Sequence, residues 1–130
     1  MTPWSDADTP IAELSRSIRA FNEAREWGPF HSQRNLAMAL SVEANELLEL
    51  YLWSADRGPQ PPVAAREPRV AEEAADVLIT LLNFCDHAGV NLAAAVQAKL
   101  AANAVRYPVD QARGRLEKAD ELAADPRSVP

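Results

Sequence analysis

Two stretches decide the fold: residues 36–50 read LAMALSVEANELLEL, and residues 70–84 read VAEEAADVLITLLNF. In both, apolar side chains recur every three or four residues, the spacing of one helix face turned toward a core. Acids interrupt these apolar faces as pairs spaced by three residues, namely Glu43 with Glu46 and Glu73 with Asp76. The sequence therefore predicts two helices that each place a carboxylate pair beside or within a core-facing stripe.

Four acids that face inward need an explanation. Residues three apart on a helix share one side, and two like charges about 4 Å apart repel by about 4 kcal/mol at an effective dielectric near 20. Such acids can be protonated, can face solvent, or can be held together by a cation. Because two pairs interrupt apolar stripes, we favour the cation. Hard oxygen ligands, with no cysteine or second histidine at ligand spacing, favour Mg²⁺, with Mn²⁺ as a substitute.

Bulk composition excludes several classes of protein. The chain has 130 residues, a formal net charge of −6 and a pI near 4.9, which argues against binding nucleic acid. No apolar run approaches the roughly 20 residues of a membrane span, and residues 1–10 lack the pattern of a leader. We therefore expect a cytoplasmic protein with one domain over residues 1–130 and no nucleic-acid or membrane partner. Cys85 reads as a packed core thiol.

The helical periodicity predicts an all-α protein resembling a four-helix bundle. The expected helices begin and end near residues 9 and 27, 32 and 55, 68 and 87, and 92 and 107. Ser32 and Asn91 are the expected N-caps of the second and fourth helices. A proline-rich linker, residues 57–68, joins the second and third helices. We expect a core over about residues 10–107, with a flexible N-terminal arm and a flexible C-terminal tail.

The third helix predicts self-association. Residues 77–82 read VLITLL and are apolar on nearly every side of a helix, so the segment must be covered all round. A small four-helix domain can hardly do this alone. We therefore expect a homodimer or a homotetramer.

Two further groups of side chains are candidates for binding. Trp27, Phe30 and His31 follow one another closely in a chain with only 6% aromatic residues, and Trp53 lies one helical turn beyond Leu50. Lys99, Asn103 and Arg106 are spaced by four and then three residues, so they share one edge of the fourth helix. Such an edge is often plain surface, but beside an acid cluster it could equally clamp phosphate oxygens.

The acidic frame, the aromatic group and the basic edge, in this order, resemble the MazG-like all-α nucleotide pyrophosphohydrolases, and most closely their dCTP pyrophosphatase branch. The resemblance spans about residues 10–118. It implies an oligomer of helical bundles that hydrolyses a (deoxy)nucleoside triphosphate to the monophosphate and pyrophosphate. The implied substrate is dCTP or a modified dCTP, and the implied role is nucleotide pool sanitation.

The resemblance also implies a role for each group of residues. The catalytic and Mg²⁺-binding residues would be Glu43, Glu46, Glu73 and Asp76. The base would be enclosed by Trp27, Phe30, His31 and Trp53, and the phosphates would meet Lys99, Asn103 and Arg106. The general base that activates water would be Glu46 or Glu72, and the sequence does not choose between them. Two positions depart from the branch, which often has a tyrosine near the base where this chain has Thr80, and Lys-Tyr where it has Lys118-Ala119.

The same residues allow two other functions. A non-catalytic helical module that oligomerises or senses nucleotides would keep the same fold and bind without turnover. A carboxylate-bridged di-iron bundle requires a Glu-x-x-His pair on each of two helices. Neither His31 nor His87 follows a glutamate at that spacing, which makes the di-iron reading the weakest.

Overall fold

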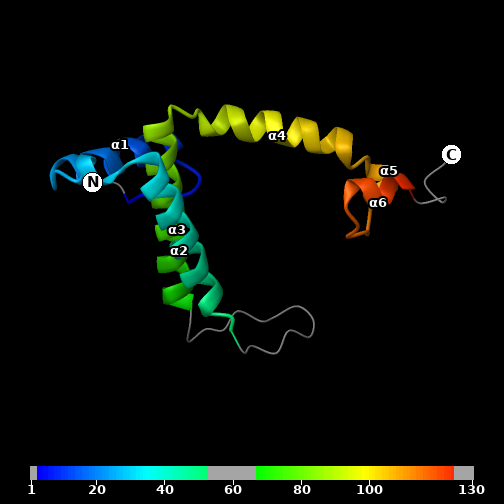
Figure 1. The fold of residues 1–130 in the computed structure, drawn as a ribbon, viewed down its shortest axis with the longest axis horizontal. Helices are drawn as coiled ribbons and strands as arrows, with labels where there is room; N and C mark the ends of the chain where they lie inside the picture. The colour runs from blue at the N-terminus through cyan, green and yellow to red at the C-terminus, as the bar shows by residue number, and fades with distance from the viewer. Residues whose placement is uncertain (1–2, 53–66, 125–130) are drawn as a thin grey trace. The chain divides into compact units, whose positions relative to one another are not determined.

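The computed structural model describes residues 3–52 and 67–124, and every regular element among them is helical (Figure 1). The elements are α1 (Ile11–Glu23), the 3₁₀ helix η1 (Gly28–Phe30), α2 (Gln33–Glu49), α3 (Glu67–Ala88), α4 (Leu92–Arg106), α5 (Val109–Ala112) and α6 (Ala119–Ala124). The prediction of an all-α fold with four long helices is confirmed. The chain divides into two compact units, Met1–Val90 and Asn91–Pro130, which we call the first and second units.

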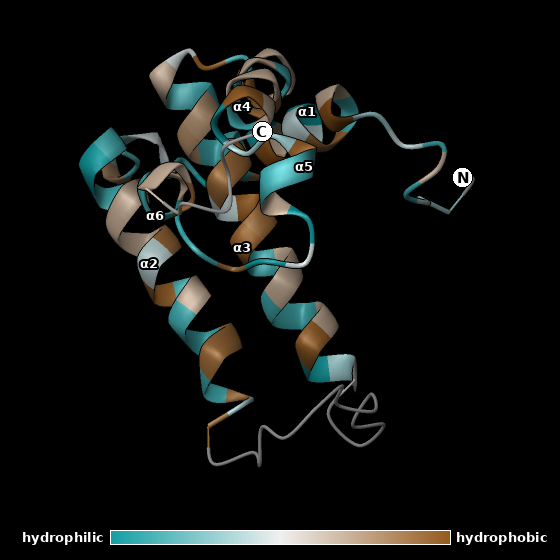
Figure 2. Ribbon diagram, turned by 90° about the vertical axis from the view of Figure 1, so that its right-hand side faces the viewer, coloured by the Kyte–Doolittle hydropathy of each residue, from teal (hydrophilic) through white to brown (hydrophobic). Residues whose placement is uncertain are grey.

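The first unit is built on α2 and α3, which lie side by side and run in opposite directions (Figures 1 and 2). Leu36, Leu82 and Cys85 are buried in it, so the prediction of a packed core thiol is confirmed. Helix α1 packs on α3. Its Arg19 donates hydrogen bonds from two guanidinium nitrogens to both carboxylate oxygens of Asp86 on α3, one of them 3.0 Å long. This ion pair fixes α1 across one end of the α2–α3 pair.

Both predicted N-caps are confirmed. The Ser32 hydroxyl accepts a hydrogen bond from the Asn35 backbone N–H at 3.1 Å, and the Asn91 side chain accepts one from Ala94 at 3.1 Å. These contacts satisfy backbone donors that a helix start leaves unpaired.

Two predicted helix ends were wrong. Helix α1 ends at Glu23 rather than near Gly28, because Glu26 adopts a φ of 54° and the Trp27 N–H turns back to the Asn22 carbonyl at 3.2 Å. This is a Schellman closure, with a glutamate where glycine is usual. Helix α2 ends at Glu49, short of the predicted residue 55. Because α1 ends at Glu23, Trp27 lies in the connection that follows the helix.

The second unit contains α4, α5 and α6. The tail was expected to lack a core pattern, yet residues 109–112 and 119–124 form short helices, and Leu122 is only 1% exposed. Helix α4 exposes Val96, Leu100 and Val105.

None of the described helices is individually long and apolar enough to span a membrane; only α3 and α4 counted together, as a bent pair, reach that length and composition.

Candidate active site

Three of the four predicted acids converge. Glu43 comes from α2, and Glu73 and Asp76 come from α3. One carboxylate oxygen from each lies within 4.8 Å of the others. The antiparallel pairing of the two helices produces this meeting, since it sets the middle of α2 against the first half of α3. Glu43 and Glu73 are half-buried, and Asp76 is exposed.

The electrostatics of the cluster show strain between like charges. The pKa of Glu43 is raised above its ordinary value of 4.5, first by burial and then by the negative charges of Glu46, Asp76 and Glu73. Among the described residues, no cationic side chain contributes to this shift. Three oxygen donors this close fit a hard divalent cation, which would neutralise the repulsion.

The remaining acids lie outside the cluster of three. Glu46 is exposed and does not belong to it, although its charge acts on Glu43. Glu72 is exposed on α3 and lines neither the cluster nor the cleft described next.

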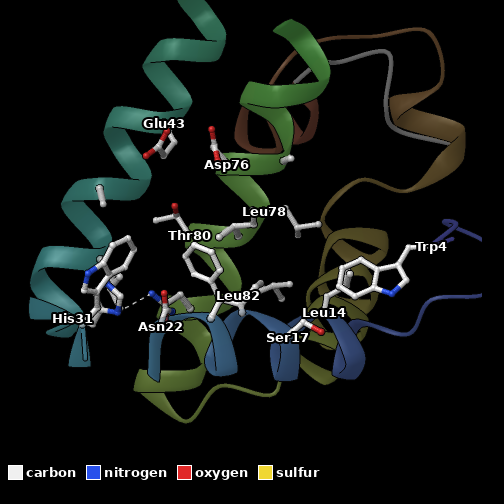
Figure 3. Close-up of a pocket in the computed structure, with 18 residues that line it drawn as sticks. Trp4, Leu14, Ser17, Asn22, His31, Glu43, Asp76, Leu78, Thr80 and Leu82 are labelled. Atoms are coloured by element: carbon white, nitrogen blue, oxygen red, sulfur yellow. Dashed lines mark hydrogen bonds between the residues drawn. The ribbon is translucent and has the colours of Figure 1, made fainter. Parts of the chain in front are cut away.

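A cleft of about 680 Å³ opens beside the acids within the first unit. Glu43 and Asp76 face each other at one end of it, and Thr80 lies on the same side of α3 toward the other end (Figure 3). Most of the other lining residues are small or apolar, and they include Ala39, Ala75, Ile79 and Leu82. Trp4, from the N-terminal arm, also lines the cleft.

Aromatic rings and imidazoles gather at the end of the cleft away from the acids. The Trp27 ring meets Phe21 edge to face with centroids 5.8 Å apart, and meets His31 at 6.2 Å. His31 in turn meets His87 at 5.8 Å. Trp27 and His31 both line the cleft, whereas Phe30 does not and is 68% exposed. Trp53 lies outside the described residues.

A buried amide organises this end. Asn83 on α3 is only 7% exposed, and its side-chain nitrogen lies 3.2 Å from Nδ1 of His31. Its backbone carbonyl accepts from Nδ1 of His87 at 3.0 Å. The pKa of His31 is lowered, first by burial and then by the neighbouring His87, so the His31 ring is neutral at physiological pH.

The candidate phosphate-binding residues lie on α4 in the second unit. Lys99 and Arg106 are exposed and Asn103 is half-buried. The Arg106 guanidinium lies 5.8 Å from the Tyr107 ring centroid, and the Asn103 carbonyl accepts the Tyr107 N–H at 2.8 Å. The structure confirms that they belong to one helix, and their role stays a prediction.

Comparison with known proteins places the chain. Residues 38–122 match the MazG-like family, over more than half of the sequence. The chain belongs to the MazG-like family. This MazG-like chain is 39% identical to dCTP pyrophosphatase 1 from Rattus norvegicus, covering 92% of itself and 72% of that protein. It is 38% identical to dCTP pyrophosphatase 1 from Homo sapiens over the same shares. A pyrophosphatase crystal structure from Archaeoglobus fulgidus superposes with a TM-score of 0.67 at 33% identity, covering 83% of this chain and 98% of that one.

Sequence reasoning missed several polar residues of the cleft in this MazG-like chain. Ser17 and Asn22 on α1, and Asn83 on α3, line it. The available signal was a polar residue at a core-facing position, since Asn22 follows Ile18 by one helical turn and Asn83 stands within the run LLNF. This is the same signal that identified Glu43, applied to amides.

Proposed function

We propose that this MazG-like chain hydrolyses a deoxynucleoside triphosphate between its α and β phosphates in a Mg²⁺-dependent reaction, with dCTP or a modified dCTP as the expected substrate. The products are the nucleoside monophosphate and pyrophosphate. One observation carries the proposal: carboxylates from two helices converge at one end of a cleft whose other end holds Trp27 and His31. The likeness to proteins named dCTP pyrophosphatase 1 supports the choice of base.

The acids suit this chemistry. Displacement at phosphorus needs mainly charge neutralisation, positioning and a water nucleophile, and it needs no protein nucleophile. Glu43, Glu73 and Asp76 would hold Mg²⁺, with Glu46 completing the set, and Mn²⁺ could substitute. When bound, the cation would supply charge neutralisation on the phosphate oxygens and activation of water.

The remaining residues position the substrate or move a proton. Trp27 and His31 would contact the base, and Thr80 would lie between the base and the acids. A carboxylate that the cation does not fully engage could act as the general base toward water. Glu46 is a better candidate than Glu72, because its charge acts on Glu43 and so it lies near the cluster. Phe30 and Trp53 keep their predicted roles at the base.

Lys99, Asn103 and Arg106 would neutralise the phosphates, from the same subunit or from a neighbouring one. We propose that the protein acts as a homodimer or homotetramer, in which each chain of residues 1–130 works as one domain. The exposure of Leu78 and Ile79 on α3, and of Leu100 on α4, supports such an assembly. A net charge of −6 fits a protein that acts on free nucleotides in the cytoplasm and not on nucleic acid or membrane.

The test is a panel of the eight common nucleoside and deoxynucleoside triphosphates, assayed for pyrophosphate with Mg²⁺ and with chelator. We expect pyrophosphate and monophosphate from dCTP above the others, and none with chelator. Glu43→Gln should abolish the signal, whereas Glu49→Gln, which changes an exposed acid near the end of the same helix, should retain it. Failure of wild type to release pyrophosphate from any substrate would contradict the proposal, and binding without product would indicate a nucleotide-sensing module.

A further inference from the structure

The contacts of Asn83 set the proton positions on two histidines at once. An amide nitrogen can only donate a hydrogen bond, so Nδ1 of His31, 3.2 Å away, must accept and carry no proton. In a neutral ring the proton is then on Nε2. A backbone carbonyl can only accept, so the carbonyl of Asn83 requires a proton on Nδ1 of His87. The two rings therefore adopt opposite tautomers around one residue.

The location of the His31 ring makes its tautomer relevant to binding. His31 lines the cleft, and Figure 3 labels it at the end away from Glu43 and Asp76. Within residues 3–52 and 67–124, Nε2 of His31 has no hydrogen-bond partner. A neutral ring thus presents one unpaired N–H donor, whose position is fixed from behind by a buried amide.

We propose that Asn83 is a positioning residue that holds His31 as a neutral Nε2–H donor for a hydrogen-bond acceptor on the nucleobase. The inference rests on the proposed function and deepens it, because it specifies what the base must offer. Cytosine offers two acceptors on its pairing edge, N3 and O2, whereas thymine carries a proton on N3. A fixed donor that meets N3 therefore favours cytosine over thymine. A fixed donor that meets O2 favours any pyrimidine over a triphosphate that has no base.

The groups around His31 allow this state to persist. The titratable side chain in contact with it is His87 on α3, and beyond His87 stand Asp86 and its partner Arg19 on α1. His87 is the second cause, after burial, that lowers the pKa of His31, so this neighbour also favours the neutral form of the His31 ring.

The first test reads the tautomer directly and needs no turnover. Nitrogen NMR of the full chain should show His31 protonated at Nε2 and not at Nδ1, and dCTP should shift the Nε2 resonance. In Asn83→Asp the carboxylate accepts from His31, so the proton should move to Nδ1 and the pKa of His31 should rise. Gln33→Leu removes a different hydrogen bond between α2 and α3, from Gln33 Nε2 to the His87 carbonyl, and should leave the tautomer unchanged. A wild-type His31 protonated at Nδ1, or an Nε2 resonance unmoved by dCTP, would overturn the proposal.

The second test separates positioning from packing. Steady-state kinetics are measured for dCTP and for 2-deoxyribose 5-triphosphate, which lacks the base, in wild type, Asn83→Leu and Asn83→Asp. Loss of one base hydrogen bond should lower kcat/KM for dCTP about tenfold, mainly through KM, and leave the baseless substrate unaffected. Equal losses on both substrates would mean that Asn83 only supports the fold and would overturn the proposal. A wild type inactive on every triphosphate overturns the proposed function instead, and the NMR result then decides the role of Asn83.

Discussion

The two ends of the cleft are organised in opposite ways. At the acid end, Glu43, Glu73 and Asp76 bring like charges together, and burial and these charges raise the pKa of Glu43. At the other end, Asn83 donates a hydrogen bond to His31, and the lowered pKa of His31 favours its neutral form. The acid end could therefore bind a cation that neutralises its charges, while the other end is already ordered by its own hydrogen bonds.

The largest expected effect comes from the acid end. Replacing Asp76 by Asn removes one negative ligand from the cluster of three and keeps its shape, so it should lower kcat by about a thousandfold, given that a bound cation supplies several kcal/mol of transition-state stabilisation. The measurement is pyrophosphate release from dCTP at saturating Mg²⁺. A parallel Glu49→Gln variant controls for loss of surface charge. Activity of Asp76→Asn within a few fold of wild type would mean that the metal site lies elsewhere.

A smaller effect is expected at the aromatic end. Trp27→Ala removes a ring that lines the cleft and packs against Phe21 and His31, and stacking with a base is worth about 1–3 kcal/mol. KM for dCTP should therefore rise about tenfold or more, with kcat less affected. Phe30→Ala should have a smaller effect, since Phe30 is exposed and outside the cleft lining and can contact the base only at its edge. Equal effects of the two variants would argue against Trp27 as the base contact.

The comparison also predicts a change in stability at the acid end. A raised pKa means that Glu43 favours the folded state when protonated, so this contribution is present below pH 4.5 and is lost as the pH rises through the higher folded-state value. Glu43→Gln should therefore raise the Tm of the metal-free protein by about 3 °C at neutral pH. Thermal melts with chelator at pH 4 and pH 7 would show it. A lower Tm for Glu43→Gln than for wild type at neutral pH would contradict the claim that the charged form of Glu43 destabilises the fold.

The smallest effect is expected outside the cleft. Arg19→Ala breaks the exposed ion pair with Asp86, which should lower the free energy of unfolding only slightly. The pKa of Asp86 is lowered below 3.8, chiefly by its hydrogen bond from Arg19, so the loss should appear at neutral pH and vanish as the pH falls through that lowered value and Asp86 becomes protonated. Urea denaturation at pH 7 and at several pH values below 3.8 measures this, and a deficit that does not shrink toward acid pH would point to lost packing of α1.

The sequence predicted what depends on helical period and local chemistry. The acids at Glu43 and Glu73 were found because they break an apolar stripe, and the caps at Ser32 and Asn91 because their residue types are characteristic. The family resemblance added the order of the groups along the chain.

What the sequence did not predict depends on tertiary contacts or on backbone conformation. The end of α1 was missed because Glu26 adopts a left-handed conformation that a glutamate rarely takes, while Gly28 was the more obvious stop. The importance of Asn83 emerges only when α3 is set beside His31. Leu122 was overlooked because the short tail helix has too few residues to show a period.

The central claim is that carboxylates from α2 and α3 hold a divalent cation between them. Titration of the full chain with Mn²⁺, followed by electron paramagnetic resonance, tests it most directly. We predict saturable Mn²⁺ binding in wild type, and Mg²⁺ should displace the bound Mn²⁺. Glu43→Gln and Asp76→Asn should each weaken Mn²⁺ binding strongly, whereas Glu49→Gln should leave it unchanged. Equal binding in all four proteins, or none in wild type, would contradict the account.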